Sequence, residues 1–400
     1  MRIGFLYNHD QIHQIPHSLP IALELARLHP EAEILLAVTT DRIEAEIRRL
    51  IGPNLPACLR IERLLIRSSG RQWAASLLDF ALPAQKLLIY GDNLTFFSSL
   101  DILVVTERTS LILKTRFGLQ RPLMVLADHG AGDRAIGFGS SAAQFDHILA
   151  AGQKTRDRLQ SEAGVDPEKI SVTGYVKFDM KPCRTASLPM NANGRQTVLY
   201  NPHLSPHLSS WYKWGRSLLD WFCDQDRYNL IFAPHIMLFE RRFVFTVDRF
   251  RIGLPGRLAS RYAGHAHIHI DLGSTASTDM TYTNAADVYL GDVSSQIYEF
   301  LAHPRPCAFL NPFGYHHDGD PNFAHWRAGP VIDGLAELPA KLEAASNEHA
   351  SYYRHRQQQL IDYTFAPALP SASAKAASVL IALGSRTAVA KSDSSVTLNA

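Results

Sequence analysis

The sequence lacks several features that mark common protein classes. Its 400 residues hold only four cysteines, and no two of them form a Cys-x-x-Cys pair. This argues against a zinc cluster, a redox motif and a disulfide framework, and is typical of a reducing cytoplasm. No apolar run approaches about 18 residues, and the apolar start at 3–7 is too short for a signal peptide. We therefore expect neither a membrane span nor export.

An excess of charge of one sign is also missing. The chain has 40 Lys and Arg against 38 Asp and Glu, a formal net charge of +2. This balance argues against a nucleic-acid partner, but it leaves room for a local basic face at an anionic membrane surface. The hydrophobic share of 46% and the charged share of 20% are ordinary for a globular protein.

Glycine fingerprints and metal-ligand clusters are weak. No Gly-x-Gly-x-x-Gly follows the first apolar run, so an NAD-dependent oxidoreductase is disfavoured. The alternating histidines at 265, 267 and 269 fit one face of a strand better than a metal site. Asp318 and Asp320 resemble a D-x-D metal motif, but a solvated Gly- and Pro-rich loop is the simpler interpretation. We expect no metal to be required and no cofactor to be bound.

Short apolar runs alternate with helical patterns along most of the chain, which indicates repeated βα units. Because the runs are apolar throughout, they predict parallel sheets buried on both faces. A helix is predicted at 73–80. The first half predicts strands at 2–7, 34–39, 59–65, 86–90, 102–106, 123–127 and 147–150.

The periodicity disappears between Lys181 and Gln196, where Pro, Asn, Ser and Gly dominate, and a new strand begins at Thr197. Length alone favours two domains. We predict an α/β protein with two Rossmann-like domains whose parallel sheets face each other across a cleft. The predicted parts are a first domain at 1–182, a linker at 183–195, a second domain at 196–384 and a disordered tail at 385–400.

Four loops that follow apolar strands carry residues suited to anions or to proton transfer. The first has His129, a candidate general base, with Gly130 and Gly132 allowing close backbone approach. The second has Pro234-His235, and the third has Asn201-Pro202-His203. Each of these also fits a plain turn with polar side chains.

The sharpest signal is the fourth loop, which runs from Gly291 through Asp292 and Ser294-Ser295 into a predicted helix with Gln296 and Glu299. Hydroxyls and unpaired backbone N–H groups at such a turn suit a phosphate. An ordinary serine N-cap is the alternative interpretation.

Taken in order, these loops resemble those of the CDP-glycerol glycerophosphotransferases, the family of teichoic-acid-type polymerases, which has a GT-B fold. Residues 123–179 end in Thr173-Gly174-Tyr175-Val176-Lys177-Phe178-Asp179, which is similar to the family's Thr-Gly-Tyr-Pro-Arg-x-Asp. Residues 285–309 are similar to its Ala-Asp-x-x-x-x-Asp-x-Ser-Ser segment with a following helix and Lys-Pro turn. The Asn201-Pro202 and Pro234-His235 loops lie where that family has Tyr-x-Pro and Arg-x-His-Pro.

The resemblance implies a role for each loop. His129 would be the catalytic base, and His235 would assist catalysis and hold the donor pyrophosphate together with Ser294 and Ser295. The remaining donor-site residues would be Gly130, Asn201, Pro202, Asp292, Gln296 and Glu299. The first domain would then lie on the acceptor side and the second would bind the nucleotide donor.

The implied reaction moves a glycerol-phosphate or related group from a CDP-linked donor to an acceptor hydroxyl of a surface polymer or lipid-linked glycan. We expect a cytoplasmic protein with peripheral contact at the membrane and no nucleic-acid partner. Two alternatives stay open, because the Ser-Ser and Thr-Gly segments also resemble hydrolysing nucleotide-sugar 2-epimerases: such an isomerase, or a GT-B glycosyltransferase that uses a nucleotide sugar. A third class is a nucleotide-binding protein of the same fold without catalysis.

Overall fold

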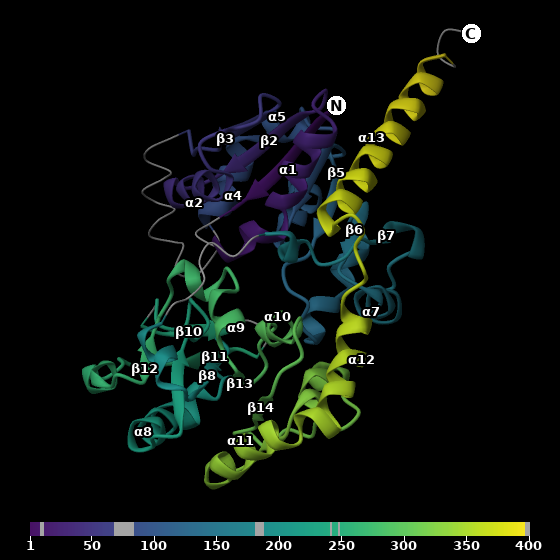
Figure 1. The fold of residues 1–400 in the computed structure, drawn as a ribbon. Coiled ribbons are helices and arrows are strands. Elements are labelled where there is room, and N and C mark those ends of the chain that lie inside the picture. The colour runs from purple at the N-terminus through teal and green to yellow at the C-terminus, as the bar shows by residue number, and fades with distance from the viewer. Residues whose placement is uncertain (9–11, 68–83, 181–187, 241, 247–248, 397–400) are drawn as a thin grey trace. The chain divides into compact units, whose positions relative to one another are not determined.

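The computed structural model describes residues 1–8, 12–67, 84–180, 188–240, 242–246 and 249–396. These residues form two units (Figure 1). Unit 1 contains Met1–His129, Phe138–Met180 and Thr364–Ala400, and unit 2 contains Gly130–Gly137 and Lys181–Tyr363. The simple division into 1–182 and 196–384 had placed residues 130–137 in the first domain and residues 364–384 in the second.

Unit 1 is built on a seven-stranded parallel sheet with the order β3-β2-β1-β4-β5-β6-β7. The strands are β1 (Arg2–Tyr7), β2 (Glu33–Val38), β3 (Leu59–Arg63), β4 (Ile102–Val105), β5 (Leu123–Ala127), β6 (His147–Ala150) and β7 (Ile170–Val172). Side chains of β1 alternate between its two faces: Phe5 joins one hydrophobic core and Leu6 the other. The expected parallel sheet, buried on both faces, is therefore present.

Helices cover both faces of this sheet. On one face lie α1 (Leu19–Leu28), α2 (Asp41–Ile51) and α13 (Ala372–Val396). The other face packs against α4 (Ala84–Asp92), α5 (Leu94–Ser98) and α7 (Gln153–Ala163), and the short α6 spans Ile112–Thr115. Within the described residues, no helix combines the length and the apolar character needed to cross a bilayer.

Two expected elements differ from the structure. Residues 86–90 lie in helix α4 and not in a strand. A short apolar run suits either element, and here Ile89 and Tyr90 pack into the core from a helix while the Lys86 ammonium pairs with Glu107. In place of the disordered tail from Ser385, α13 continues to Val396, because an alanine-rich sequence favours a helix. The helix predicted at 73–80 and the first part of the linker, residues 183–187, lie outside the described residues.

Unit 2 repeats the same design with a six-stranded parallel sheet in the order β12-β9-β8-β13-β14-β15. Its strands are β8 (Gln196–Asn201), β9 (Tyr228–Phe232), β12 (Ile268–Ile270), β13 (Val288–Gly291), β14 (Cys307–Leu310) and β15 (Val331–Ile332). The helices of this unit include α8 (Arg216–Asp224), α9 (Thr281–Ala285), α10 (Gln296–Leu301), α11 (Leu338–Asn347) and α12 (Arg354–Thr364). A separate antiparallel hairpin joins β10 (Val244–Thr246) and β11 (Arg251–Gly253).

The strand order of unit 2 places β9, β8 and β13 side by side. In each parallel sheet the carboxyl ends of neighbouring strands meet at one edge, which is where open α/β sheets bind ligands. Three of the four loops singled out from the sequence follow these strands, so they meet at that edge of unit 2.

Candidate functional site

Direct hydrogen bonds hold the three loops of unit 2 together. The Asn201 side-chain amide donates to the Ala233 carbonyl at 2.6 Å, and the Tyr289 hydroxyl donates to Asn201 Oδ1 at 3.3 Å. The His235 backbone N–H donates to the Pro202 carbonyl at 3.0 Å. Asn201 is buried and its side chain is directed at the protein. Asn201 therefore holds the three loops together at this edge of the sheet.

Asp292 has a similar organising position. Its Oδ1 accepts the backbone N–H groups of His203 at 2.9 Å and of Val293 at 2.7 Å. Its Oδ2 accepts the backbone N–H of Ser210 at 2.6 Å and the Ser210 hydroxyl at 2.8 Å. Burial raises the pKa of Asp292, and these bonds oppose that effect. The carboxylate links the turn that follows β13 to the loop that contains His203, so it fixes the backbone of both loops.

The two Pro-His loops share one local geometry. The Ser205 backbone N–H donates to His203 Nδ1 at 2.9 Å, and the Met237 backbone N–H donates to His235 Nδ1 at 3.3 Å. A ring nitrogen that accepts a hydrogen bond carries no proton, so the single proton of a neutral His235 ring lies on Nε2. The two ring centroids lie 6.0 Å apart.

Arg134 adds a cation to this group. Its Nη1 lies 3.3 Å from His203 Nε2, and because a guanidinium can only donate, that ring nitrogen is the acceptor of this hydrogen bond. Burial, followed by the charges of Arg134, His235 and His207, holds the pKa of His203 well below its ordinary value. The guanidinium brings a fixed positive charge to this edge of the sheet, which suits an anion. The place of Arg134 beside His203 depends on chain segments 69 residues apart, so no local pattern reveals it.

The serine turn combines capping with an exposed hydroxyl. Ser294 is buried, and its Oγ accepts the Gln296 backbone N–H at 3.3 Å, as in an N-cap. Ser295 is exposed. The Gln296 amide donates to the Ser277 carbonyl at 2.8 Å, and Glu299 is buried in α10. Of these four residues, Ser295 offers a hydroxyl at the surface of the turn.

The glycine loop lies against this serine within unit 2. Gly130 has a φ of +92°, and a Cβ atom placed there would lie 3.3 Å from Ser295 Oγ. A Cβ atom at Gly132 would lie 3.3 Å from Ser295 Cβ. The close approach requires both glycines. Two of the loops predicted from the sequence, the Gly130 loop and the Ser294-Ser295 turn, are therefore in contact.

A buried cluster missed by the sequence reasoning fixes both loops. Asp133 Oδ2 accepts the His325 backbone N–H at 2.9 Å and lies 2.8 Å from His325 Nδ1, and the Tyr298 hydroxyl donates to the same carboxylate at 2.7 Å. His325 Nε2 lies 3.0 Å from the Asp292 carbonyl, which also accepts from Trp326 Nε1 at 2.9 Å. Both ring nitrogens of His325 thus face acceptors. Asp133 and His325 stand 192 residues apart, and no local motif marks either of them.

His129 lies in unit 1, where its orientation is set by β4. Its Nδ1 lies 2.6 Å from the Thr106 carbonyl, which can only accept, so Nδ1 carries the proton and the neutral ring keeps its lone pair on Nε2. The ring is partly exposed. Burial raises the pKa of the neighbouring Asp128, with His129 and Arg108 opposing that effect. His129 therefore has the tautomer that a general base requires.

Two further histidines surround His129, and the sequence patterns had not pointed to either. The ring centroids of His13 and His17 lie 6.2 Å and 6.4 Å from that of His129. Burial, followed by the charges of Lys177, His129 and His13, holds the pKa of His17 well below its ordinary value. Lys177 comes from the Thr-Gly-Tyr segment quoted above. Unit 1 thus places two further imidazoles beside the candidate base, with the Lys177 ammonium acting on His17.

The features discounted from the sequence have ordinary contacts. His267 Nε2 lies 2.9 Å from the Phe222 carbonyl, and His269 Nε2 lies 2.8 Å from the Tyr282 hydroxyl. Asp320 caps the turn that follows it by accepting the Asn322 backbone N–H at 2.8 Å. In the described part of the chain, no group of three or more His, Cys, Asp or Glu side chains is placed to hold a metal ion.

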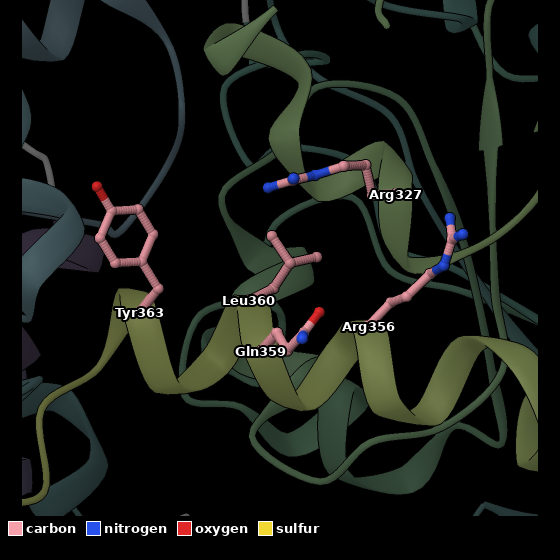
Figure 2. A pocket seen from close by; sticks show the side chains of 5 residues that line it. All are labelled: Arg327, Arg356, Gln359, Leu360 and Tyr363. Carbon is pink, nitrogen blue, oxygen red and sulfur yellow. The ribbon is translucent and has the colours of Figure 1, made fainter. Parts of the chain in front are cut away.

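A pocket of about 370 Å³ lies elsewhere on unit 2. Figure 2 shows Arg327 facing side chains from α12 across this pocket. Its lining residues are Arg327, Arg356, Gln359, Leu360 and Tyr363. None of them belongs to the loops described above.

No protein-family model and no curated protein sequence matches the chain. Among solved structures, it is similar to the wall teichoic acid polymerase TagF soaked with CDPG, with a TM-score of 0.61, 13% identity and coverage of 96% of this chain and 89% of that one. It is also similar to a putative UDP-N-acetylglucosamine 2-epimerase from Listeria monocytogenes, with a TM-score of 0.55, 11% identity and 95% coverage of both chains. The UDP-GlcNAc 2-epimerase from Neisseria meningitidis bound to UDP-GlcNAc gives a TM-score of 0.55 at 11% identity, covering 96% of this chain and 99% of that one.

At these identities the likeness shows the fold. The expected GT-B-like α/β fold, with two Rossmann-like units built on parallel sheets, is confirmed.

Proposed function

With that fold as the starting point, we propose that the chain is a transferase that moves a glycerol-phosphate or related group from a CDP-linked donor to an acceptor hydroxyl. The acceptor is a surface polymer or a lipid-linked glycan. His129 is the general base, and the edge of the unit 2 sheet holds the donor pyrophosphate. The donor site comprises Gly130, Asn201, Pro202, His203, Arg134, His235, Asp292, Ser294, Ser295, Gln296 and Glu299.

One observation carries the proposal: backbone groups select opposite tautomers in His129 and His235. His129 donates from Nδ1 to a carbonyl and keeps an acceptor at Nε2. His235 accepts the Met237 backbone N–H at Nδ1, so the proton of its neutral ring lies on Nε2. A transfer reaction needs one group that takes a proton and others that stabilise negative charge. His129, the proposed base, and Gly130, the first residue of the proposed donor site, are consecutive in the sequence.

The chemical step follows from these roles. The acceptor oxygen attacks the β-phosphorus and loses its proton to His129 Nε2. A new P–O bond forms while the bond from the β-phosphorus to the bridging oxygen breaks, and CMP leaves with that oxygen. The His235 imidazole N–H and the Arg134 guanidinium offset the charge on the phosphates. Phosphoryl transfer depends mainly on such positioning and charge stabilisation, which these groups supply without a metal.

Replacement of His129 tests the proposal. His129→Ala should lower turnover about 100- to 10,000-fold, the usual contribution of positioned proton transfer, with little change in donor affinity. His235→Ala should also weaken donor binding. Release of CMP in the presence of acceptor measures the rate, and calorimetry measures the affinity. Near-normal turnover in the His129 variant would remove the base assignment and leave His235 as the next candidate.

The similarity to two UDP-GlcNAc 2-epimerase structures gives the alternative a specific basis: a nucleotide-sugar transferase or a hydrolysing 2-epimerase. A thermal-shift panel of CDP-glycerol, CDP-ribitol and UDP- and CMP-sugars separates the donors, since a ligand at 100 times its Kd adds about 2.7 kcal/mol of stability. Incubation with donor alone then separates the reactions. An epimerase changes the sugar without an acceptor, whereas a transferase needs one.

The proposal includes a cytoplasmic location with peripheral membrane contact and no requirement for a metal or cofactor. Full activity in excess EDTA is the expected result. Strict rescue by magnesium or manganese would instead return Asp318 and Asp320 as ligand candidates.

A further inference from the structure

The β10–β11 hairpin of unit 2 exposes an apolar face. Phe245 on β10 pairs directly with Ile252 on β11, so both side chains lie on the same side of the hairpin. Phe250 and Leu254 lie just outside β11, two positions before and after Ile252, and both are exposed. The four residues are between 50% and 79% exposed, and the rings of Phe245 and Phe250 lie 6.3 Å apart. Single exposed apolar residues are common, but four at one hairpin form a patch.

The opposite face fixes the hairpin to unit 2. Val244 and Thr246 are buried, and Thr246 Oγ1 donates to the Arg251 carbonyl at 3.3 Å. A Cβ atom at Gly253 would lie 2.5 Å from Pro206 and 2.6 Å from Tyr212, so the backbone lies directly against those side chains. Trp211 Nε1 donates to the Pro255 carbonyl at 2.9 Å. The apolar face is therefore presented on an anchored support.

Arginines lie close to this face in the sequence. Arg242, Arg249 and Arg257 are exposed, whereas Arg251, also exposed, pairs with Thr246 and lies on the opposite side of the hairpin. In the sequence, residues 241–257 contain five arginines and one aspartate, although the net charge of the whole chain is only +2. An apolar tip with cations nearby suits a surface with hydrocarbon beneath anionic headgroups. A second copy of the chain is a poorer match, because facing hairpins would bring like charges together.

We propose that the hairpin face of Phe245, Phe250, Ile252 and Leu254 inserts into the headgroup region of a bilayer that contains anionic phospholipids. Arg242, Arg249 and Arg257 contact the lipid phosphates, and their aliphatic stems lie along the apolar side chains. The insertion depends on the hairpin alone and not on which donor the enzyme uses. It provides a physical route to a lipid-linked acceptor.

Flotation of the full chain with vesicles tests this proposal. Binding should be strong on phosphatidylcholine mixed with phosphatidylglycerol, weak on phosphatidylcholine alone, and reduced by added salt. The double variant Arg242→Gln with Arg249→Gln should bind the mixed vesicles about 25-fold more weakly, at about fivefold per arginine. Phe250→Ser with Ile252→Ser should lose about tenfold for each side chain removed.

Matched control variants make the same change in net charge, or remove side chains of similar exposure, at positions outside the hairpin. Arg60→Gln with Arg116→Gln removes two exposed arginines elsewhere, and Leu65→Ser with Leu369→Ser removes two exposed leucines of unit 1. Both should bind like the parent. The thermal shift of each hairpin variant with the donor panel should also match the parent's, so failure of the proposed reaction and failure of lipid binding are separate results.

Three outcomes would overturn the proposal. In the first, the parent chain fails to bind either kind of vesicle. In the second, the hairpin variants bind as well as the controls. In the third outcome, light scattering shows a dimer that the hairpin variants abolish, which would assign the face to a contact between two copies of the chain.

Discussion

Replacing Asp133 by asparagine tests whether the buried cluster of unit 2 holds the candidate donor site in shape. Asp133 and His325 are nearly inaccessible, with side chains 0% and 2% exposed. Asparagine keeps the volume of the side chain but loses its charge, and its amide cannot accept at both former oxygen positions. The change therefore removes an acceptor from either Tyr298 or His325 without opening a cavity.

The expected cost follows from these contacts. Removing one partner of a buried charged pair costs about 3–5 kcal/mol, and a hydrogen bond to a charged group is worth about 1.5–3 kcal/mol. Because asparagine retains one acceptor and most of the packing, we expect a loss of about 2–4 kcal/mol in the free energy of unfolding. A double-mutant cycle with His325→Gln should give a coupling energy of about 1–3 kcal/mol, since the two side chains are in direct contact.

Urea denaturation followed by tryptophan emission is suited to this measurement. Trp211, Trp214, Trp221 and Trp326 belong to unit 2, and Trp326 donates to the same Asp292 carbonyl as His325. The exposed Asp318→Asn is the control and should change stability by less than about 0.5 kcal/mol. If Asp133→Asn unfolds at the same urea concentration as the control, or if the cycle shows no coupling, the cluster does not support the site.

Three further predictions concern the site. Ser294→Ala with Ser295→Ala should weaken donor binding by about 1–3 kcal/mol, and unchanged affinity by calorimetry would remove the serine turn from the site. Gly130→Ala should weaken donor binding more than Gly118→Ala, because both positions have positive φ but only the Cβ at Gly130 meets Ser295; equal effects would contradict this. The free energy of unfolding should decrease as the pH is lowered. His17 and His203 have lowered pKa values in the folded protein, so on acidification below the ordinary value of 6.5 the unfolded chain binds protons first. Stability should therefore be complete above about pH 6.5 and decrease below it, by about 1.4 kcal/mol for each unit of pKa lowering, and the melting temperature of His17→Asn should depend less on pH than that of the parent.

The sequence predicted most strands because the strands of a parallel sheet buried on both faces consist of short apolar runs. It failed at 86–90, where the same apolar character belongs to helix α4. It also failed at the tail, where the alanine-rich helix α13 continues past the predicted boundary at Ser385 to Val396.

The candidate site was predictable where its residues follow strands. His235, Ser295 and Gly130 were found in this way. Local patterns gave no signal for Asp133 or His325, whose significance comes from a contact across 192 residues. The tautomers of His129 and His235 depend on backbone atoms of other loops or of later residues, which composition and spacing do not reveal.

The position of α13 affects how the chain is made. Its residues Ala372, Ala376, Ala377 and Leu380 complete a core whose other members come from β1, α1 and neighbouring elements of the first half. All seven strands of that sheet have been synthesised by Val172, about 200 residues before α13 begins. At about 5–20 residues per second, ribosomes take roughly 10–40 s to cover that distance. During that interval the newly synthesised sheet exposes the apolar surface that α13 later covers. A chaperone that binds the nascent chain would bind at that surface.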